Sequence, residues 1–205
     1  MTNVVLIGAG GHSKVIQDII KANRHLTLHA VLDQKFKKRY IDGGVIYGHT
    51  DFIDEFVQEN ISFSIAIGNN KARQKLVEQL PIPDDKYTSL IHPDSTISPT
   101  ATIGCGTVVM AQSVINADTS IGKHAIINSG SVIEHDNRLD DFVHISPNAS
   151  LAGTVVIGEG SHVGTGATVI PGKTIGNWSE VGAGAVAVNN VEDGVTVVGV
   201  PAKKI

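Results

Sequence analysis

A repeat of six residues fills the second half of the chain and constrains its fold more than any other feature. From Ile97 to Val181, every sixth residue is Ile, Leu or Val, in fifteen consecutive positions without an insertion. The residue four places after each is usually small, with Asn137, Val143, Val155 and Lys173 as the exceptions. A period of six matches neither the 3.6 residues of a helical turn nor the alternation of a strand, so it indicates a repeat architecture.

This pattern predicts a parallel β-helix built from hexapeptides. One branched apolar residue in each short strand fills the interior, and the small residue lets the chain turn a corner. Each coil then pairs with the next at the usual strand spacing of about 4.8 Å. Three hexapeptides make one triangular coil, so the repeat predicts five coils.

Composition changes near residue 92 and predicts two domains, residues 1–92 and 93–205. Seven of the nine aromatic residues precede this point, and fifteen of the 22 glycines follow it. Aromatic side chains suit an ordinary core, whereas a narrow prism favours Ile and Val. The boundary falls at His92-Pro93, where the proline disfavours helix for the residue before it.

The first domain alternates apolar runs with segments of helical spacing, which predicts a Rossmann-like α/β domain with a parallel sheet and right-handed crossovers. We expect a polar loop over Lys35–Gly48 and a helix capped by Thr50. The strands are expected at Val4–Ile7, Leu26–Leu32, Ile61–Ile67 and Tyr87–Ile91, and the other helices at Ser13–Ala22 and Asn70–Leu80.

A glycine-rich turn, Gly8–His12, joins the first strand to the first helix. Such a turn brings backbone N–H groups at a helix N-terminus close to a phosphate. The dinucleotide motif requires a third glycine, where this chain has Ser13, while Asp33 lies where an acid can meet a ribose hydroxyl. The turn alone serves equally well as a tight connection, so it is weak evidence for NAD.

Charge and cysteine content exclude several classes of function. The chain has 16 Lys and Arg against 20 Asp and Glu, a net charge of −4, and no basic stripe typical of nucleic-acid binding. Its single cysteine, Cys105, allows no disulfide within the chain and favours a reducing compartment. The apolar run within residues 1–10 is too short for a signal peptide or a membrane span. We therefore expect a soluble, cytoplasmic protein.

Two polar clusters on the predicted coil are candidates for chemistry. His135 precedes Asp136, and a carboxylate beside an imidazole fixes its tautomer and raises its basicity. His144 and His162 are eighteen residues apart, so they should stack on one another. Zinc enzymes of the γ-carbonic-anhydrase type carry two histidines with four residues between them, a spacing that this chain lacks. We expect no metal.

Four motifs, in matching order along essentially the whole chain, resemble the PglD/NeuD family of bacterial sugar acyltransferases: Gly8–His12, Ala66–Asn70, Ser131–Asp136 and Gly199–Lys203. The resemblance implies a homotrimer with sites between subunits, a nucleotide-binding first domain and a left-handed β-helix that binds acetyl-CoA. PglD-type members acetylate a 4-amino group on a UDP-linked deoxysugar.

The resemblance also implies roles for individual residues. His135 matches the base that deprotonates the acceptor amine, and Asp136 matches the acid that tunes it, where PglD carries the longer Glu. Asn128 and His12 match residues near the acceptor. Nucleotide-sugar contacts are matched by Gly10, Gly11, His12, Asp33 and Gly68, with Gln34 in place of a second acid. The acetyl-CoA groove is matched by His144, Gly153, Thr165 and Ala183, of which His144 and Gly153 keep the expected type.

We therefore expect an N-acetyltransferase that moves an acetyl group directly from acetyl-CoA to a nucleotide-linked amino sugar. Cys105 is about thirty residues from His135 and is a poor nucleophile candidate. Two alternatives stay open. One is O-acetylation of a sialic-acid-like sugar, as in NeuD-type members, and the other is a non-catalytic trimeric scaffold that binds nucleotides. The His135–Asp136 pair argues against the scaffold, which needs no such pair.

Overall fold

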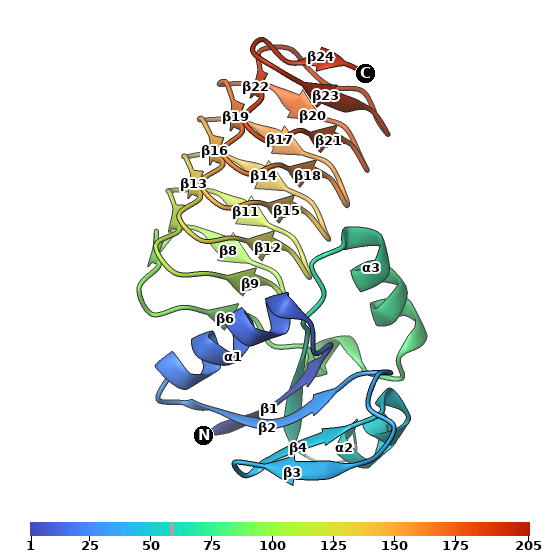
Figure 1. The fold of residues 1–205 in the computed structure, drawn as a ribbon. Coiled ribbons are helices and arrows are strands. Elements are labelled where there is room, and N and C mark those ends of the chain that lie inside the picture. Colours follow the sequence, from blue (N-terminus) through green and yellow to red (C-terminus); the bar gives the residue numbers. More distant parts are fainter. Residues whose placement is uncertain (58–59) are drawn as a thin grey trace.

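The computed structural model describes residues 1–57 and 60–205, and it contains an N-terminal α/β domain at one end of a long coil (Figure 1). The sheet of the first domain has the order β3-β4-β2-β1-β5, and all neighbours except β3 and β4 run parallel. Its elements are β1 (Thr2–Ile7), α1 (Gly11–Ala22), β2 (Leu26–Leu32), β3 (Tyr40–Asp42), β4 (Val45–Gly48), α2 (Ile53–Val57), β5 (Ile61–Ile65) and α3 (Asn70–Gln79). The predicted α/β fold of this domain is confirmed.

Three local predictions were wrong. The segment Lys35–Gly48 is not a loop throughout, because it contains the hairpin β3–β4. Gly43 and Gly44 form its turn with φ angles of 55° and 83°, which suits the tight turns of hairpins. The cap before α2 is His49 rather than Thr50: its side chain accepts a hydrogen bond from the Asp51 backbone N–H, and a short 3-10 turn over Thr50–Phe52 leads into α2.

The third correction concerns Tyr87–Ile91, which is not one strand of the first domain. Tyr87 makes a single parallel bridge to Phe63 of β5. Leu90–Ile91 form β6, which pairs with Val108–Val109 of the coil. The chain therefore passes from one sheet to the other within a few residues, and the boundary between residues 92 and 93 stays a prediction.

The coil consists of two-residue strands that recur every six residues, and each pairs in parallel with the strand eighteen residues further on. Three stacked sheets result (Figure 1): β22-β19-β16-β13-β10-β7, then β20-β17-β14-β11-β8, and β24-β23-β21-β18-β15-β12-β9-β6. We call them the first, second and third coil sheets. The fifteen predicted strands are β7 (Thr96–Ile97), β8 (Thr102–Ile103), β9 (Val108–Val109), β10 (Val114–Ile115), β11 (Ser120–Ile121), β12 (Ile126–Ile127), β13 (Val132–Ile133), β14 (Arg138–Leu139), β15 (His144–Ile145), β16 (Ser150–Leu151), β17 (Val156–Ile157), β18 (His162–Val163), β19 (Thr168–Val169), β20 (Thr174–Ile175) and β21 (Glu180–Val181).

The coil ends with β22 (Val186–Ala187), β23 (Thr196–Val198) and β24 (Lys203–Lys204). Among the described residues, no helix is both long and apolar enough to cross a bilayer.

The interior of the coil is filled by the predicted apolar residues, which form one continuous buried cluster. The small residues four places later are also mostly buried, and so is the polar exception Asn137. Its amide donates to the Glu134 carbonyl oxygen at 2.6 Å and accepts from the Val155 N–H at 2.7 Å, so the buried polar group is satisfied. From Gly106 to Gly184, the residue before each of these corner positions takes a left-handed conformation, as Asp136 does with a φ of 58°.

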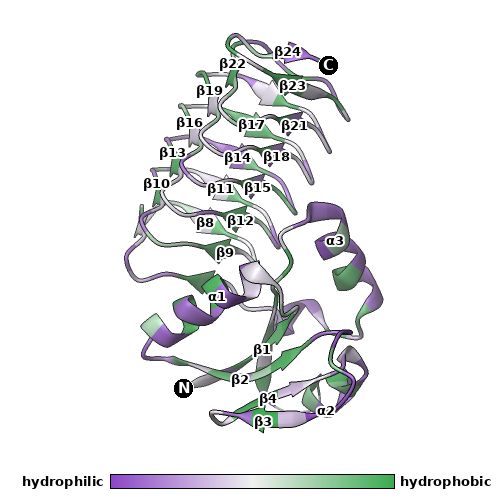
Figure 2. Ribbon diagram, viewed as in Figure 1, coloured by the Kyte–Doolittle hydropathy of each residue, from purple (hydrophilic) through white to green (hydrophobic). Residues whose placement is uncertain are grey.

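The third coil sheet changes character along its outer face, and this change positions the site. At the lower rungs its outward residues, Val108 and Ile126, are buried against Ile16 and Ile20 of α1 and the sheet of the first domain. Figure 2 shows α1 beside these lower rungs, with the hydrophobic strand β1 below it. At the higher rungs the outward positions pass through the ladder His144–His162–Glu180–Thr196. The polar part of the ladder begins above the rungs that pack on α1, and it faces the start of α3.

Candidate active site

The His135–Asp136 pair lies in the turn between β13 and β14. Nδ1 of His135 is 2.7 Å from Oδ2 of Asp136, and the two side chains are 59% and 55% exposed. The left-handed backbone of Asp136 belongs to the coil corner, so the repeat itself turns the carboxylate toward the ring. The shorter Asp therefore reaches its partner. A carboxylate on Nδ1 holds the proton there and leaves Nε2 free to accept one, as a general base requires.

Gly153 lies directly against the His135 imidazole, one coil higher. A Cβ atom at Gly153 would be 2.7 Å from Cε1 and 2.8 Å from Nε2 of His135. No side chain fits there without moving the ring. The acetyl-CoA contact at Gly153 stays a prediction. Independently of that contact, a side chain at this position would collide with the His135 ring.

Histidine rings stack on the third coil sheet, as the spacing of eighteen predicts. The centroids of His144 and His162 are 4.9 Å apart with an angle of 25° between the rings. Asn128 Nδ2 lies 3.1 Å from Nε2 of His144, and Ser146 Oγ lies 2.7 Å from Nε2 of His162. Each ring is thus fixed by a neutral polar neighbour.

These two histidines are neutral at physiological pH. Burial, with smaller contributions from the charges of His162, Arg73 and His12, lowers the pKa of His144 to about 3. Burial also lowers the pKa of His162, although Glu180, with its carboxylate oxygen 3.5 Å from Nδ1, raises it. They can therefore donate and accept hydrogen bonds without carrying charge. The exposed His135 differs from them because its partner is a carboxylate.

A polar pocket of about 500 Å³ separates the start of α3 from the histidine ladder. One wall is Gly68–Lys71, and the other includes His144, His162, Trp178 and Glu180. The predictions assigned Gly68 to the nucleotide sugar and His144 to acetyl-CoA. The structure brings these two residues to one pocket, at the junction of the two domains.

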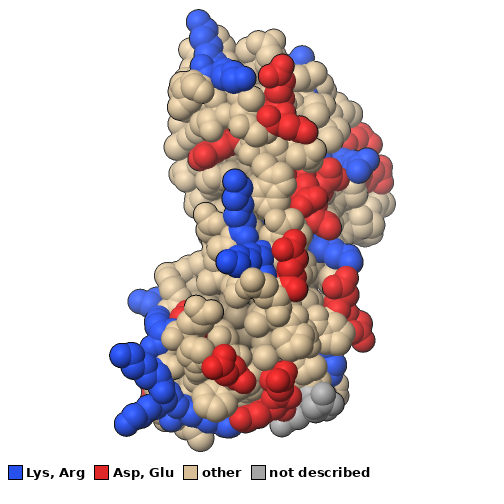
Figure 3. Space-filling view, turned by 90° about the vertical axis from the view of Figure 1, so that its right-hand side faces the viewer, with Lys and Arg blue, Asp and Glu red and all other residues tan. Residues whose placement is uncertain are grey.

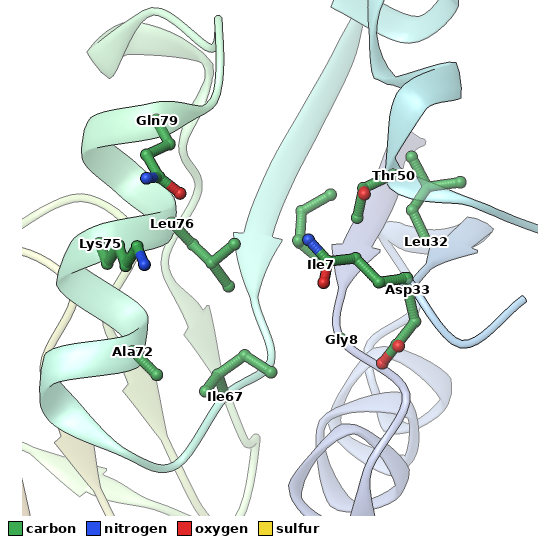
Figure 4. A pocket seen from close by; sticks show the side chains of 11 residues that line it. Ile7, Gly8, Leu32, Asp33, Thr50, Ile67, Ala72, Lys75, Leu76 and Gln79 are labelled. Atoms are coloured by element: carbon green, nitrogen blue, oxygen red, sulfur yellow. The ribbon is translucent and has the colours of Figure 1, made fainter.

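A second pocket, of about 300 Å³, lies at the carboxyl ends of β1, β2 and β5 (Figure 4). Ile7 and Gly8 follow from β1, Asp33 and Gln34 from β2, and Leu76 comes from α3 on the opposite side. The chain passes from β1 through α1 to β2 on one side, and it later returns through α2 to β5 on the other side of β1. Ligands of α/β sheets bind where the strand order reverses in this way.

The Asp33 carboxylate already holds the glycine turn in place. Its Oδ2 accepts the Ala9 N–H at 2.7 Å, and its Oδ1 accepts the Lys35 N–H at 2.9 Å. Gly10 and Gly11 start α1, and a Cβ on either would meet no described atom within 4 Å. No side chain caps the N-terminus of α1, and the space beside these two glycines is open, which suits the approach of a phosphate.

His12 ends this turn and lies close enough to His144 of the ladder for its charge to affect that ring. Burial, and then the charge of Arg73, lowers the pKa of His12 to about 4. Its Nε2 is buried with no hydrogen-bond partner among the described residues. The neutral ring carries unused hydrogen-bonding capacity at the junction of the two domains.

One chain does not bring all predicted residues together. His135 and Gly153 lie at the corner between the first and second coil sheets, whereas His144 is on the third. Thr165 and Ala183 lie in the stacked turns after β18 and β21, at the other corner of the first sheet. His135 therefore lies on a different part of the prism from His144 and His162. The predicted acetyl-CoA contacts fall on two corners and one face of a single prism.

Sequence reasoning missed several residues at the junction. Glu180 continues the ladder eighteen residues after His162, so counting in coils would have found it. Lys71 and Trp178 line the polar pocket, and buried Arg73 lies behind it. Arg73 sits in a polar helix whose pattern gives no sign that one arginine is buried.

Two rival kinds of site find no support in the part of the chain that is described. No group of three or more His, Cys, Asp or Glu is placed to hold a metal ion within residues 1–57 and 60–205. Burial raises the pKa of the Cys105 thiol, which disfavours the thiolate.

Lys and Arg gather at one lower corner of the N-terminal domain, while charges of both signs lie along the rest of this face (Figure 3).

Comparison with known proteins defines first a class and then a family. Residues 3–80 match the PglD N-terminal domain, and residues 100–135 match the six-repeat hexapeptide of bacterial transferases. The fold is therefore a PglD-type α/β domain followed by a left-handed hexapeptide β-helix. The chain belongs to the PglD-type family of sugar acyltransferases.

Three relatives illustrate the family. The structure of PerB from Caulobacter crescentus, in complex with CoA and GDP-perosamine, is 39% identical, has a TM-score of 0.91, and the match covers 100% of this chain and 98% of that one. The acetyltransferase domain of PglB from Neisseria gonorrhoeae, in complex with acetyl coenzyme A, is 38% identical with a TM-score of 0.88 over 99% and 98% of the chains. UDP-N-acetylbacillosamine N-acetyltransferase of Bacillus subtilis (strain 168) is 47% identical over 115 residues, which span 54% of this chain and 52% of that relative.

Proposed function

We propose that the protein transfers an acetyl group from acetyl-CoA to the amino group of a nucleotide-linked amino sugar, with a UDP-linked 4-amino-deoxysugar as the leading acceptor. The relatives named as N-acetyltransferases of UDP- and GDP-linked sugars support this class of reaction. The observation that carries it is the exposed His135–Asp136 pair, whose carboxylate fixes the tautomer and whose Nε2 is free. A scaffold needs no such pair.

Transfer is direct. Nε2 of His135 takes a proton from the acceptor amine while the nitrogen attacks the thioester carbonyl carbon. The carbon–sulfur bond then breaks, and the imidazolium returns its proton to the leaving thiolate of CoA. General-base help of this kind contributes ~10²–10⁴-fold to the rate. A donor to the carbonyl oxygen is also needed, and we assign none.

The first domain holds the nucleotide, and the coil holds acetyl-CoA. Gly8 and Asp33 border the pocket at the strand ends, and the N-terminus of α1 beside them suits the diphosphate. Gly10, Gly11, His12, Gln34 and Gly68 keep their proposed role in nucleotide-sugar binding, while Asn128 lies near the acceptor and His144, Gly153, Thr165 and Ala183 line the acetyl-CoA groove. The pocket between Gly68 and His144 is where sugar and thioester would meet.

Because His135 and His144 lie on different sides of one prism, the site is completed by a second copy of the chain in a homotrimer. The first coil sheet is the surface best suited to that contact. None of its outward residues carries a charge, and all except the exposed Thr96 at its lower end are half-buried already in one chain: Val114, Val132, Ser150, Thr168 and Val186. The second sheet instead presents exposed Ser120, Arg138 and Thr174. Acetyl-CoA as co-substrate fits a cytoplasmic location.

The test is release of free thiol from acetyl-CoA in the presence of UDP-, GDP- and CMP-linked amino sugars, with each product analysed by mass spectrometry. We expect an N-acetylated sugar and faster turnover with one nucleotide. Acetylation of a hydroxyl in a sialic-acid-like sugar would favour the alternative O-acetyltransferase. Absence of turnover with every acceptor would contradict the proposal. Light scattering that shows a monomer at micromolar concentration would remove the shared site.

A further inference from the structure

Arg73 of α3 is a buried cation at the junction of the two domains, with an exposure of only 1%. It points away from solvent and reaches two turns of the coil. Nε donates to the His124 carbonyl oxygen at 2.7 Å, and Nη2 donates to the Phe142 carbonyl oxygen at 2.8 Å. These two acceptors are eighteen residues apart, so Arg73 spans consecutive coils.

The other side of the same guanidinium holds the chain segment that forms one wall of the polar pocket. Nη1 donates to the carbonyl oxygens of Ile67 at 3.1 Å and Gly68 at 3.2 Å, and Nη2 donates to Asn70 Oδ1 at 2.9 Å. Gly68 and Asn70 line the pocket opposite His144. One side chain therefore ties this wall, which we call the Gly68–Asn70 wall, to the coil.

The five N–H groups of Arg73 meet five acceptors, which is the full capacity of a guanidinium. Burial lowers the pKa of Arg73 to about 9, so it stays charged at neutral pH. A buried charge whose bonds are broken is costly, and its planar fork cannot be copied by lysine. The arrangement is therefore stiff: the wall cannot shift without losing bonds to a charged group.

Asn70 reinforces the same wall from its other end. Its Nδ2 donates to the carbonyl oxygen of Gly160 at 2.9 Å and of Ser161 at 3.3 Å. Gln74, one turn further along α3, also reaches the coil, with Nε2 2.9 Å from Oε1 of Glu159. Gln74 does not line the polar pocket, so it offers a domain contact without a role in the wall.

We propose that Arg73 is a positioning residue for acetyl transfer: it fixes the Gly68–Asn70 wall against His144, so that the acceptor held by the first domain meets the thioester held by the coil. This inference rests on the proposed function. A purely structural residue would affect the stability of the whole protein. The proposed role instead assigns a loss of reaction rate to the geometry of one pocket. The charge of Arg73 also opposes protonation of His144 and His162, the two histidines that line that pocket.

The first experiment compares Arg73→Lys with the matched control Gln74→Ala. Lysine keeps the charge but offers three donors at one point, so it cannot hold acceptors on both sides. A small misplacement of reacting groups can cost ~10²-fold in rate. We expect kcat/KM for the nucleotide sugar to fall at least ~10-fold in Arg73→Lys, with kcat lowered at saturation, while the Kd for acetyl-CoA alone changes less than about twofold. Gln74→Ala should stay within about twofold of wild type in all three quantities.

A melting curve checks that Arg73→Lys is folded. If it is not, Asn70→Ala takes its place, because it removes one of the five bonds to Arg73 and leaves the other four, although it also removes the bonds from Asn70 to the Gly160 and Ser161 carbonyl oxygens. We expect a smaller fall in kcat/KM for the sugar than in Arg73→Lys, and still a larger one than in Gln74→Ala. A folded Arg73→Lys within about twofold of wild type, an Asn70→Ala variant equal to wild type, or an equal loss in Gln74→Ala would overturn the proposal.

A second readout needs no acceptor and separates this proposal from the proposed function. Histidine ring signals of ¹³C-labelled protein are titrated by NMR with and without Arg73→Lys. A loosened wall admits water beside His144, so its pKa should rise toward the ordinary histidine value, whereas Gln74→Ala should leave it unchanged. An unchanged His144 titration in Arg73→Lys overturns the positioning role. If wild type acetylates no nucleotide sugar, the proposed function fails, and this titration still tests the wall.

Discussion

The two domains place their functional groups by different means. In the coil, backbone pairing between residues eighteen apart sets the place of each outward side chain, so His144 and His162 stack one above the other. In the first domain, the functional turns lie at strand ends and depend on side-chain hydrogen bonds. Asp33 holds the backbone of Ala9, for example, and Arg73 holds that of Gly68.

This difference indicates where each domain is sensitive to change. A coil position loses its chemistry when its own side chain is removed, while its neighbours stay in register. A turn in the first domain loses its geometry when a supporting side chain elsewhere is removed. The following predictions test that distinction.

The largest effect is expected from the coil position that carries the chemistry. His135→Ala should lower turnover by ~10²–10⁴-fold, because the general base is lost. The melting temperature should hardly change, since the imidazole is more than half exposed and lies outside the core. Steady-state kinetics and a thermal melt measure both. Turnover close to that of wild type would remove His135 from the mechanism.

Removal of an inward coil residue should destabilise the protein by about 2–5 kcal/mol, the usual cost of Leu→Ala in a core. Leu151→Ala is the test, because Leu151 is 1% exposed, and Val156→Ala on the half-buried outer face is its control. Hydrogen exchange should show lost protection in the paired strands β13 and β19 but not in β1. Equal loss in β1 would mean that the two domains respond as one unit.

Binding should separate between the domains with a smaller effect. Gly11→Val places a side chain in the open space before α1 and should weaken nucleotide-sugar binding about tenfold, without changing acetyl-CoA binding. His144→Ala should have the opposite selectivity. Isothermal titration of both ligands to both variants measures this. A Gly11→Val variant that loses both ligands equally would contradict two separate sites, and tight NAD binding by wild type would favour the dinucleotide interpretation.

The smallest effect concerns the packing between the domains at acid pH. His124 is 2% exposed, lies against Tyr87 and Phe142, and its ring nitrogens have no partner among the described residues. Burial, followed by the charge of Arg73, lowers the pKa of His124 to about 4. The unfolded chain binds this proton near pH 6.5 and the folded chain does not, so stability is lost as the pH falls from about 6.5 to 4.

His124→Phe should therefore remove about 1 kcal/mol of this loss at pH 5.5. The substitution is sterically reasonable because Phe142 adopts the same left-handed backbone one coil higher, with a φ of 59° against 53° for His124. Denaturant unfolding at pH 7.5 and pH 5.5 gives the comparison. If wild type and variant show the same dependence on pH, His124 is not neutral in the fold.

The sequence predicted the coil almost residue by residue, because one inward position every six residues leaves a single possible register. The hairpin β3–β4 was missed although Gly43-Gly44 between Ile41 and Val45 is a turn signal, because its edge strand is only three residues long and exposed. An apolar run predicts that a segment is a strand, but it does not predict the strand with which that segment pairs. The single bridge between Tyr87 and the strand Ile61–Ile65 illustrates this limit.

Site prediction has a similar limit. Residues of the coil, such as the His135–Asp136 pair, were predicted as neighbours and lie 2.7 Å apart. Arg73 was not predicted, because its burial depends on carbonyl oxygens 51 and 69 residues further along the chain. No local pattern records a contact of that kind, and only the docking of α3 on the coil creates it.

The pairing of residues eighteen apart has a consequence for how such a chain can change in length. Deletion of one residue between Ile97 and Val181 would turn every later inward side chain outward. The residues of the histidine ladder that follow the deletion would turn inward. Gain or loss of a whole coil keeps every side chain on its own face. A coil inserted above β21 would extend the prism by about 4.8 Å while His135, Gly153 and the junction with the first domain stay in place. Evolution can therefore lengthen this protein in whole coils without disturbing its chemistry.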